Sequence, residues 1–379
     1  MEIKTMSKIC KRCVMDTTCA DIHFDREGIC NYCKFYESLR SKIDLDLATK
    51  KIQLENFVKN IKNQGKGKKY DCIIGLSGGV DSSWVLLKAV EMGLRPLAVH
   101  MDNGWNSELA QQNIEQLVKG LNVDLYTHVL DWNEFRDLQE SFFNSDVIDL
   151  ELLTDNFLVS LNFEQAQKWQ TKFILSGSNT VTEGIPMPQN WAAANKYDKI
   201  NISNIWKKKG KGYPLKSISM FSLNDFYYNS HIRGIKWHRF LDFLDYKKSE
   251  AVIRLSRDYN YVPYPYKHYE SIFTRFYQGV ILPKKFGVDK RKNHFSALIM
   301  DGDMSREEAI FKLSQIPYTD EAEMLADVSY FLKKFKWTQA QLDEYLSRPQ
   351  VSHAYYGVET DLMIPLRKLK QFLVTKRRK

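Results

Sequence analysis

The chain alternates between amphipathic stretches and short apolar runs as far as residue 176. Apolar residues at helix-like spacing predict helices in four segments: 38–64, 80–92, 106–120 and 155–170. Short apolar runs predict strands in four others: 70–76, 97–102, 123–130 and 173–176. Strands that alternate with helices, at about thirty residues per strand–helix–strand unit, are typical of parallel crossovers. The predicted fold class is therefore α/β, a doubly wound, mostly parallel sheet.

The pattern changes after Gly177. Periodicity weakens there, and 207–212 is predicted to be an exposed loop. From about Asp242 helical spacing dominates, for instance over 305–315, 319–334 and 338–346. We expect three parts: residues 1–50 as a cysteine-bearing segment with a linker helix, 51–240 as the α/β domain, and 241–379 as a mainly helical, substrate-binding domain.

Composition narrows the setting. The chain has 379 residues, 44% of them hydrophobic, which suits a soluble protein with a sizeable core. No apolar stretch is long enough to span a membrane, and residues 1–6 lack a signal-peptide core, so we expect a cytoplasmic protein. The net charge of +9 fits a phosphorylated ligand, nucleic acid or a Lys-rich composition without choosing among them. The basic run 375–379 is expected to be a solvated tail.

Two CxxC pairs, separated by residues 14–29, predict a structural Zn²⁺ site. Disulfides are rare in the cytoplasm, and four thiolates close a tetrahedron without leaving a position for water. The expected ligands are Cys10, Cys13, Cys30 and Cys33. Unpaired buried thiols and an iron–sulfur cluster are the alternatives. Cys19 and Cys72 fall outside the set.

A turn rich in glycine and serine connects the predicted strand 70–76 to the predicted helix 80–92: Ser77-Gly78-Gly79-Val80-Asp81-Ser82-Ser83. Free backbone N–H groups at a helix start, with two glycines that admit close approach, favour an anion. The hydroxyl groups add donors, and Asp81 is suited to hold Mg²⁺ beside phosphates. The alternative is an ordinary capped turn, which needs neither two glycines nor three hydroxyls.

This turn resembles the pyrophosphate-binding loop (PP-loop) of the ATP pyrophosphatases, which include GMP synthetase, asparagine synthetase and tRNA-modifying enzymes. The resemblance implies ATP and Mg²⁺ as cofactors and AMP-forming chemistry, with Ser77 and Asp81 catalytic. It also implies that Asp102-Asn103-Gly104 lies near the adenosine and that Ser176-Gly177-Ser178 forms another wall. All three turns leave the carboxyl ends of predicted strands, where such sheets bind ligands.

A closer resemblance covers almost the whole chain. The runs 10–18, 102–107, 267–271 and 278–291 are similar to bacterial N-acetyl sugar amidotransferases of the pseudaminic acid and O-antigen pathways. These enzymes are understood to convert a sugar acetamido group to an acetamidino group. The resemblance implies a nucleotide-activated sugar substrate and an O-adenylated imidate that ammonia attacks, with release of AMP and pyrophosphate.

Several polar residues are then candidates for the substrate side. Lys267 and Arg275 are expected to be catalytic, in a segment predicted helical after Pro265, although a solvated helix face is the alternative. The candidates for sugar or phosphate contacts are Trp105, Asn179, Glu183, His268, Glu270, Lys284, Lys290 and Arg291. For Trp105 the alternative is core packing, for Asn179 and Glu183 an ordinary polar loop, and for the last three surface positions in a Pro- and Gly-punctuated loop. Glu183 is also a candidate Mg²⁺ contact, and His100 is expected to be a packed strand residue.

Two other functions remain open. A tRNA-thiolating enzyme shares the loop, but Cys72, in a predicted strand, is the one thiol of the 51–240 part and is poorly suited to carry sulfur. A non-catalytic binding module is the second. No segment resembles a glutaminase, so a separate glutaminase subunit is expected to supply ammonia. Neither a membrane nor a nucleic-acid partner is expected.

Overall fold

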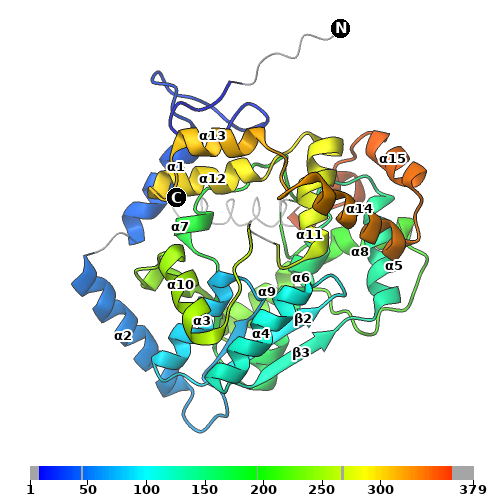
Figure 1. Ribbon diagram of the computed structural model, residues 1–379. Coiled ribbons are helices and arrows are strands. Elements are labelled where there is room, and N and C mark those ends of the chain that lie inside the picture. Colours follow the sequence, from blue (N-terminus) through cyan, green and yellow to red (C-terminus); the bar gives the residue numbers. More distant parts are fainter. Residues whose placement is uncertain (1–7, 44–45, 194, 266–268, 361–379) are drawn as a thin grey trace, which may run out of the picture.

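Five parallel strands form a single sheet in the computed structural model, which describes residues 8–43, 46–193, 195–265 and 269–360 (Figure 1). The strands lie in the order β3-β2-β1-β4-β5. Their bounds are β1 Cys72–Gly75, β2 Pro96–Asp102, β3 Leu125–Val129, β4 Phe173–Ser176 and β5 Lys236–Arg239. The chain runs outward from β1 on one side and then on the other, which confirms the doubly wound α/β class.

Helices cover both faces of this sheet. On one face lies α3 (Val80–Glu91), flanked by α4 (Glu108–Leu121) and α10 (Lys248–Tyr259). On the other face, α6 (Leu152–Lys168) crosses β1, β2 and β4. Alternate residues of β1 therefore enter different cores: Ile73 belongs to the cluster that includes α6, and Ile74 to the cluster that includes α3.

The predicted helix 38–64 is found as two helices, α1 (Asn31–Ile43) and α2 (Leu47–Gln64). Asp46 caps α2 by accepting a 2.9 Å hydrogen bond from the amide of Thr49. The prediction of an exposed loop over 207–212 is wrong at its start, because α8 (Lys199–Lys209) continues to Lys209 and Gly210 ends it. Several elements were not predicted, among them α5 (Trp132–Phe143), which packs on α8, and the edge strand β5.

The C-terminal region is mainly helical, as predicted. Its helices are α11 (Ile272–Phe276), α12 (Arg291–Asp301), α13 (Arg306–Ser314), α14 (Glu321–Phe335) and α15 (Gln339–Ser347). Between α11 and α12 runs a π-helical segment, η3 (Tyr277–Phe286), with Pro283 inside it. The Pro- and Gly-punctuated loop predicted around Gly287 is thus helical up to Phe286. Shorter elements elsewhere are α7 (Thr180–Glu183), α9 (Leu223–Tyr227), η1 (Tyr228–Ile232), η2 (Phe240–Phe243) and η4 (His353–Tyr356).

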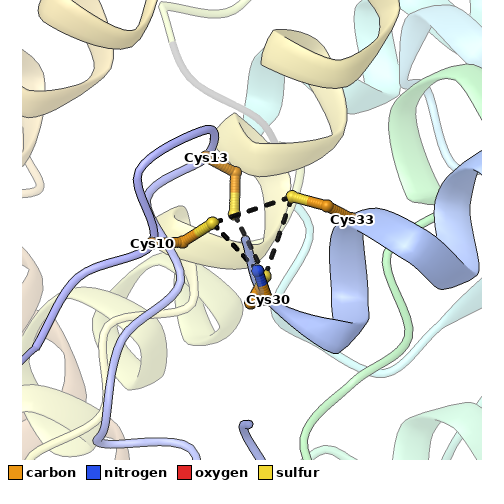
Figure 2. Close-up of side chains that lie close together, drawn as sticks. All are labelled: Cys10, Cys13, Cys30 and Cys33. Carbon is orange, nitrogen blue, oxygen red and sulfur yellow. Dashed lines mark hydrogen bonds between the residues drawn. The ribbon is translucent and has the colours of Figure 1, made fainter. Parts of the chain in front are cut away.

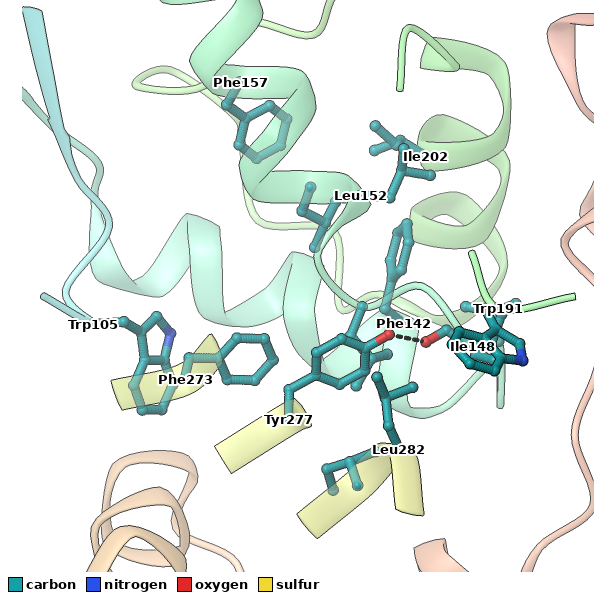
Figure 3. Packing of buried hydrophobic residues seen from close by; sticks show 14 of the residues in the cluster. Trp105, Phe142, Ile148, Leu152, Phe157, Trp191, Ile202, Phe273, Tyr277 and Leu282 are labelled. Atoms are coloured by element: carbon teal, nitrogen blue, oxygen red, sulfur yellow. Dashed lines mark hydrogen bonds between the residues drawn. The ribbon is translucent and has the colours of Figure 1, made fainter. Parts of the chain in front are cut away.

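One large apolar core joins these helices to the α/β part. Figure 3 shows Tyr277 and Leu282 of η3 packed among side chains from α5, α6 and the segment around Ile148. The hydroxyl of Tyr277 donates a 2.6 Å hydrogen bond to the carbonyl oxygen of Ile148.

The division into parts 1–50, 51–240 and 241–379 stays a prediction. Within the described part of the chain, no helix combines the length and the apolarity that a membrane crossing requires.

The cysteine-bearing segment lies against α12 and α13 (Figure 1). The backbone amide of Val14 donates a 3.2 Å hydrogen bond to the Ser296 hydroxyl. Arg306 donates hydrogen bonds to the carbonyl oxygens of Cys10 and Cys13, at 3.0 and 3.2 Å. The first part of the chain is therefore held by residues almost three hundred positions later.

Candidate functional site

The glycine–serine turn connects β1 to α3, as the sequence predicts. Gly78 has φ +84°, a left-handed conformation, and a Cβ added there would lie 2.7 Å from the carbonyl oxygen of Ala110. Gly79 is the N-cap of α3 and has no side chain with which to cap it. The turn thus needs glycine at position 78 for two reasons, and it leaves the start of a 12-residue helix without a side-chain cap, as an anion site requires.

The hydroxyl groups of the turn have different surroundings. Ser77 is exposed, and its Oγ lies 3.2 Å from both the amide nitrogen of Gly79 and the Oγ of Ser82. Ser82 also donates to the carbonyl oxygen of Gly79 at 3.2 Å. Ser83 is 1% exposed, and its Oγ has no hydrogen-bond partner in the described part of the chain. Of the three predicted hydroxyl donors, Ser77 is therefore the accessible one.

Asp81 lies in the first turn of α3 and accepts a hydrogen bond from the hydroxyl of Tyr246. Tyr246 is buried, and burial together with the nearby carboxylates of Asp81 and Glu183 raises its pKa. Tyr246 therefore remains a protonated donor that fixes the orientation of Asp81. The negative charges of Asp81 and Glu183 both raise the pKa of the Tyr246 hydroxyl. The two carboxylates, both candidate Mg²⁺ contacts, therefore lie within electrostatic range of the same group.

The turn after β4 lies directly against the start of α3. A Cβ added to Gly177 would lie 2.7 Å from the amide nitrogen of Ser82. The turn after β2 is held by its own polar groups: Asp102 Oδ1 accepts from the amide of Gly104 at 2.8 Å, and Asn103 Oδ1 from that of Trp105 at 3.1 Å. The three turns therefore leave the same edge of the sheet, as expected for the ends of parallel strands.

A cavity of about 650 Å³ opens at this edge, between the sheet and the C-terminal helices. Its walls include the ends of β1, β2 and β4, one side of α6, the segment 182–187, and residues of α11 and α12. The predicted site residues that line it are Ser77, Asn103, Ser176, Glu183, Glu270, Arg275, Lys290 and Arg291. Residues that the sequence places more than two hundred positions apart thus surround one space, of a size common for ligand sites.

Glu270 belongs to the C-terminal region yet reaches the glycine–serine turn. Its carbonyl oxygen accepts a 2.9 Å hydrogen bond from the amide of Ser107, and Ser271 forms an antiparallel bridge with Asn106. A Cβ added to Gly79 would lie 3.0 Å from the carboxylate of Glu270. The prediction that this segment is helical from Pro265 is wrong for 269–271, because residues 269–270 form a turn and Ser271 is extended in its bridge with Asn106; α11 begins at Ile272.

A wall of alternating charges forms another side of the cavity. Lys290 lies 3.3 Å from Glu151 at the start of α6. Lys196 lies 2.6 Å from Asp155 and 3.1 Å from Asp149. Burial by itself raises the pKa of Asp149, but the charges of Lys196 and Lys290 outweigh it and hold that pKa well below its ordinary value. Asp149 is therefore ionised near neutral pH, and the acidic side chains of Glu151 and Asp155 line the cavity together with the basic side chains of Lys196 and Lys290.

Two predicted cations are engaged within the protein. Arg275 forms two 2.5 Å hydrogen bonds to Asp327 and a 2.8 Å bond to Glu323, and it stacks on Tyr269 at 4.8 Å. Arg291 pairs with Asp289 and donates to carbonyl oxygens at the C-terminal end of α13. Both line the cavity, but their strongest contacts hold helices together. A direct catalytic role for Arg275 therefore stays a prediction.

Other predicted residues lie away from the cavity. Trp105 is 1% exposed, packs against Trp132 and Phe273, and donates a 2.8 Å hydrogen bond to Gln139, which is the core-packing alternative. Asn179 caps α7 and is fully buried. The described predicted residues absent from the cavity lining are Gly78, Gly79, Val80, Asp81, Ser82, Ser83, Asp102, Gly104, Trp105, Gly177, Ser178, Asn179 and Lys284.

Some predictions fall outside the described residues. These are the catalytic and substrate roles of Lys267 and His268, the basic run 375–379, and the absence of a signal peptide at residues 1–6. His100, in contrast, is described and is packed as predicted, at 7% exposure. Its Nδ1 donates to the carbonyl oxygen of Leu76 at 2.8 Å, so its Nε2 accepts from Asn106 at 3.0 Å. Burial lowers its pKa, which favours this neutral form.

Several cavity residues were not predicted, among them Glu151, Asp155 and Asn162 of α6 and its N-cap, and Lys196. The spacing of the residues on α6 is that of an ordinary amphipathic helix and does not by itself indicate a functional site. Polar residues on the side of a helix that faces a sheet were the available signal, because such a side is normally apolar.

The four predicted zinc ligands converge on one point. Figure 2 shows their sulfur atoms facing one another. All four residues are fully buried, and the sulfur pairs 13–30, 30–33 and 10–33 are 3.6, 3.7 and 3.9 Å apart. Tetrahedral Zn²⁺ with ligands at about 2.3 Å requires sulfurs about 3.8 Å apart. Backbone amides of Arg12, Met15 and Cys30 point at the sulfurs, at 3.3–3.4 Å. The residues fit Zn²⁺, and the spacing is too short for a cluster of several iron atoms.

Comparison with known proteins identifies a family match for the C-terminal region. Residues 270–370 match the family model described as LPS biosynthesis protein WbpG-like, C-terminal domain. This match, over somewhat more than a quarter of the chain, confirms the resemblance for the region that supplies Glu270, α11 and α12 to the cavity. None of the curated proteins matches the chain in sequence.

Two solved structures are remotely similar. NMN synthetase from Francisella tularensis has 13% sequence identity and a TM-score of 0.34, over 74% of this chain and 97% of that one. NH3-dependent NAD synthetase from Campylobacter jejuni, in complex with nitrate, has 14% identity and a TM-score of 0.31, over 56% of this chain and 84% of that one. At these TM-scores the similarity is remote, and the strand order and connectivity of the sheet define the fold class.

Proposed function

We propose that this chain, which carries a WbpG-like C-terminal domain, is an ATP-dependent, AMP-forming N-acetyl sugar amidotransferase. It converts an acetamido group of a nucleotide-activated sugar to an acetamidino group. The observation that carries the proposal is the cavity: Ser77, the first residue of the PP-loop sequence, and the family domain's first residues, from Glu270 onward, line the same space, and Gly79 of the loop lies against Glu270. The role after which that family is described, LPS biosynthesis, supports a sugar substrate.

The chemistry follows from the weakness of an amide as an electrophile. The amide oxygen attacks the α-phosphorus of ATP, forms a C–O–P link and releases pyrophosphate. Ammonia then attacks the amide carbon, the C–O bond to AMP breaks, and the nitrogen loses a proton to leave the amidine. Each step needs ATP, sugar and ammonia held together, so positioning and charge stabilisation supply most of the rate.

Residues of the glycine–serine turn and of the adjoining cavity suit these tasks. The backbone N–H groups of Gly78 to Ser83, with the Ser77 hydroxyl, receive the pyrophosphate. Asp81, with Glu183, would hold Mg²⁺, which would supply positive charge to offset that of the phosphates. Asn103 contacts the nucleotide, and Lys290, with the charged wall around it, contacts the sugar and its phosphates. The cysteine cluster takes Zn²⁺ as a structural ion.

A separate glutaminase subunit supplies ammonia in the cell, and the reaction takes place in the cytoplasm, where ATP is abundant. We propose a second subunit because no segment of the sequence resembles a glutaminase. Purified chain should use ammonium salts directly and glutamine poorly.

The rival tRNA-thiolation function receives little support from the described cysteines. Cys72 is fully buried in β1, and burial raises the pKa of its thiol. Cys19 is 1% exposed, and burial raises its pKa to about 12. Sulfur relay requires an accessible thiolate, which neither residue provides.

Mass spectrometry of acetamido nucleotide sugars incubated with the chain, Mg-ATP and ammonium tests the proposal. Replacement of oxygen by N–H lowers the product mass by about one unit, as nucleophilic displacement requires. Unchanged sugar masses across UDP- and CMP-linked diacetamido sugars, with the chain correctly folded, would count against it.

A further inference from the structure

Two buried polar atoms at the floor of the cavity have no hydrogen-bond partner in the described part of the chain. They are Oδ1 of Asn162, on α6, and Oγ of Ser176, at the end of β4. Both residues line the cavity, and they are 2% and 8% exposed. Buried polar atoms without a partner destabilise a protein unless water or a ligand satisfies them, so such a pair at a cavity indicates a bound group.

Ser176 and Gly75 occupy neighbouring positions on the face of the sheet that α6 covers. Ile74 of β1 is opposite Leu175 of β4, so Gly75 and Ser176 form the next pair. Ile73 and Ile174, two residues earlier than Gly75 and Ser176 respectively, both enter the core cluster that includes α6. Because side chains of a strand alternate between its faces, Ser176 also faces α6.

Asn162 lies over this pair because Gly75 has no side chain. A Cβ added to Gly75 would lie 3.3 Å from both Oδ1 and Nδ2 of Asn162. The Nδ2 of Asn162 donates a 2.7 Å hydrogen bond to the carbonyl oxygen of Leu158. Since a carbonyl oxygen can only accept, this bond fixes the orientation of the amide. Oδ1 is therefore a committed acceptor beside Gly75.

An acceptor oxygen and a hydroxyl oxygen together favour a small ligand rich in N–H donors. We propose that Asn162 and Ser176 form the ammonia-binding site of this cavity, an inference that rests on the proposed function. Two N–H bonds of ammonia donate to Asn162 Oδ1 and Ser176 Oγ, which leaves the nitrogen lone pair free. That lone pair forms the C–N bond to the adenylated carbon as the C–O bond to AMP breaks, and one N–H proton passes to solvent as AMP leaves.

The position of the pair favours ammonia over other N–H donors. Gly75 is two residues before Ser77, so the site adjoins the loop proposed to hold the phosphates. Both atoms are shielded from bulk water, as suits a nucleophile that must outcompete water for a reactive adenylate. The sugar acetamido N–H is attached to a ring, which is too bulky to approach two atoms buried between α6 and the sheet.

Steady-state kinetics of Asn162→Leu, at fixed pH with ammonium as the varied substrate, test the inference. Loss of one acceptor is expected to raise the KM for ammonium about tenfold, with KM values for ATP and sugar within about twofold of wild type. Exchange of labelled pyrophosphate into ATP, measured with sugar and without ammonium, should persist because adenylation precedes attack.

Gln165→Leu is the matched control. Gln165 lies on the same helix, is 5% exposed and also has a side-chain oxygen without a hydrogen-bond partner among the described residues, but it does not line the cavity. Its KM for ammonium should equal that of wild type. Ser176→Ala removes the other acceptor and carries the same prediction where Asn162→Leu does not fold.

The outcomes separate the two claims. Wild type that makes the amidine while both variants keep the wild-type KM for ammonium overturns the ammonia site alone. A rise in the KM for sugar, with ammonium unaffected, assigns the pair to the acetamido N–H and also overturns it. Wild type that makes no amidine refutes the proposed function, and the ammonia site with it.

Discussion

Lys292 of α12 forms a 2.6 Å ion pair with Asp16 of the cysteine-bearing segment, while the next two residues of α12, Asn293 and His294, line the cavity. The same segment reaches a second wall, because Thr18 accepts a 3.0 Å hydrogen bond from Asn190, which follows the cavity-lining stretch 182–187. The predicted zinc site therefore supports two cavity walls from outside.

Removal of the metal should weaken sugar binding more than nucleotide binding. The glycine–serine turn is held by α4, Tyr246 and the turn after β4, none of which belongs to the cysteine-bearing segment. Cys13→Ser or chelation is expected to raise the KM for sugar roughly tenfold or more and to lower the thermal midpoint. Metal analysis, calorimetry and ATP binding distinguish this from general unfolding. Equal losses of ATP and sugar binding in a folded protein would contradict it.

The ion pair itself predicts an acid sensitivity. Burial raises the pKa of Asp16, but Lys292 and Thr18 outweigh it and hold the pKa below its ordinary value. A depressed folded-state pKa contributes stability above the unfolded value of about 3.9 and loses it as pH falls through the folded value. Lys292→Met leaves a nearly fully buried charge alone and should cost about 3–5 kcal/mol. The deficit relative to wild type should be largest near neutral pH and shrink below about pH 4. A deficit independent of pH would contradict the pairing.

Gly78→Ala should abolish nucleotide activation. It places a side chain at φ +84° and 2.7 Å from a backbone oxygen, so the turn must move. Gly67→Ala is the matched control, since Gly67 has φ +76° with nothing within 4 Å of its added Cβ. Both should lose about 1–2 kcal/mol from the left-handed strain. Pyrophosphate exchange should fall at least a hundredfold in Gly78→Ala and remain unchanged in Gly67→Ala. Comparable exchange rates in the two variants would exclude the turn as the phosphate site.

Asp81→Asn should preserve the fold and lose activity. An asparagine oxygen still accepts from Tyr246, so the unfolding free energy should change by less than about 1 kcal/mol. The lost negative charge removes the proposed Mg²⁺ ligand, and AMP formation is expected to fall about a hundredfold or more. Titration with Mg²⁺ should show a raised half-saturation concentration. Wild-type Mg²⁺ dependence in this variant would rule out the ligand assignment.

Cys72→Ala should retain full activity per folded molecule, since its thiol is buried in β1 and is given no chemical task. Removal of one sulfur from a packed core costs roughly 1–2 kcal/mol, so protein should be compared at equal folded fraction. An inactive, well-folded variant would favour the thiolation rival.

The sequence was sufficient for the sheet and the loop because local chemistry determines both. A short apolar run such as 173–176 is compatible with few structures other than a buried strand. A glycine pair followed by Asp81 is compatible with few roles other than anion binding. In contrast, β5 is a polar edge strand that forms because β4 pairs with it. The pairing begins with a 2.8 Å hydrogen bond from the backbone amide of Lys236 to the carbonyl oxygen of Lys172. Sequence patterns carry no trace of such tertiary partners.

The substrate side was harder for a related reason. Arg275 and Arg291 were predicted as ligands because they are cations, and only the folded chain reveals the carboxylates and carbonyl oxygens that engage them. Asn162 was missed because a polar residue in a helical pattern has no distinctive spacing. Its importance depends on a glycine 87 positions earlier. Long-range juxtaposition of this kind decides the site, whereas periodicity decides the elements.

The central claim, that the acetamido oxygen is activated by AMP and leaves with it, is tested most directly by an isotope. A nucleotide sugar whose acetamido oxygen is ¹⁸O is incubated with the chain, Mg-ATP and ammonium, and the nucleotide products are analysed by mass spectrometry. The account predicts that the label appears in AMP in proportion to the amidine formed. Unlabelled AMP, or release of ADP with labelled inorganic phosphate, would contradict it.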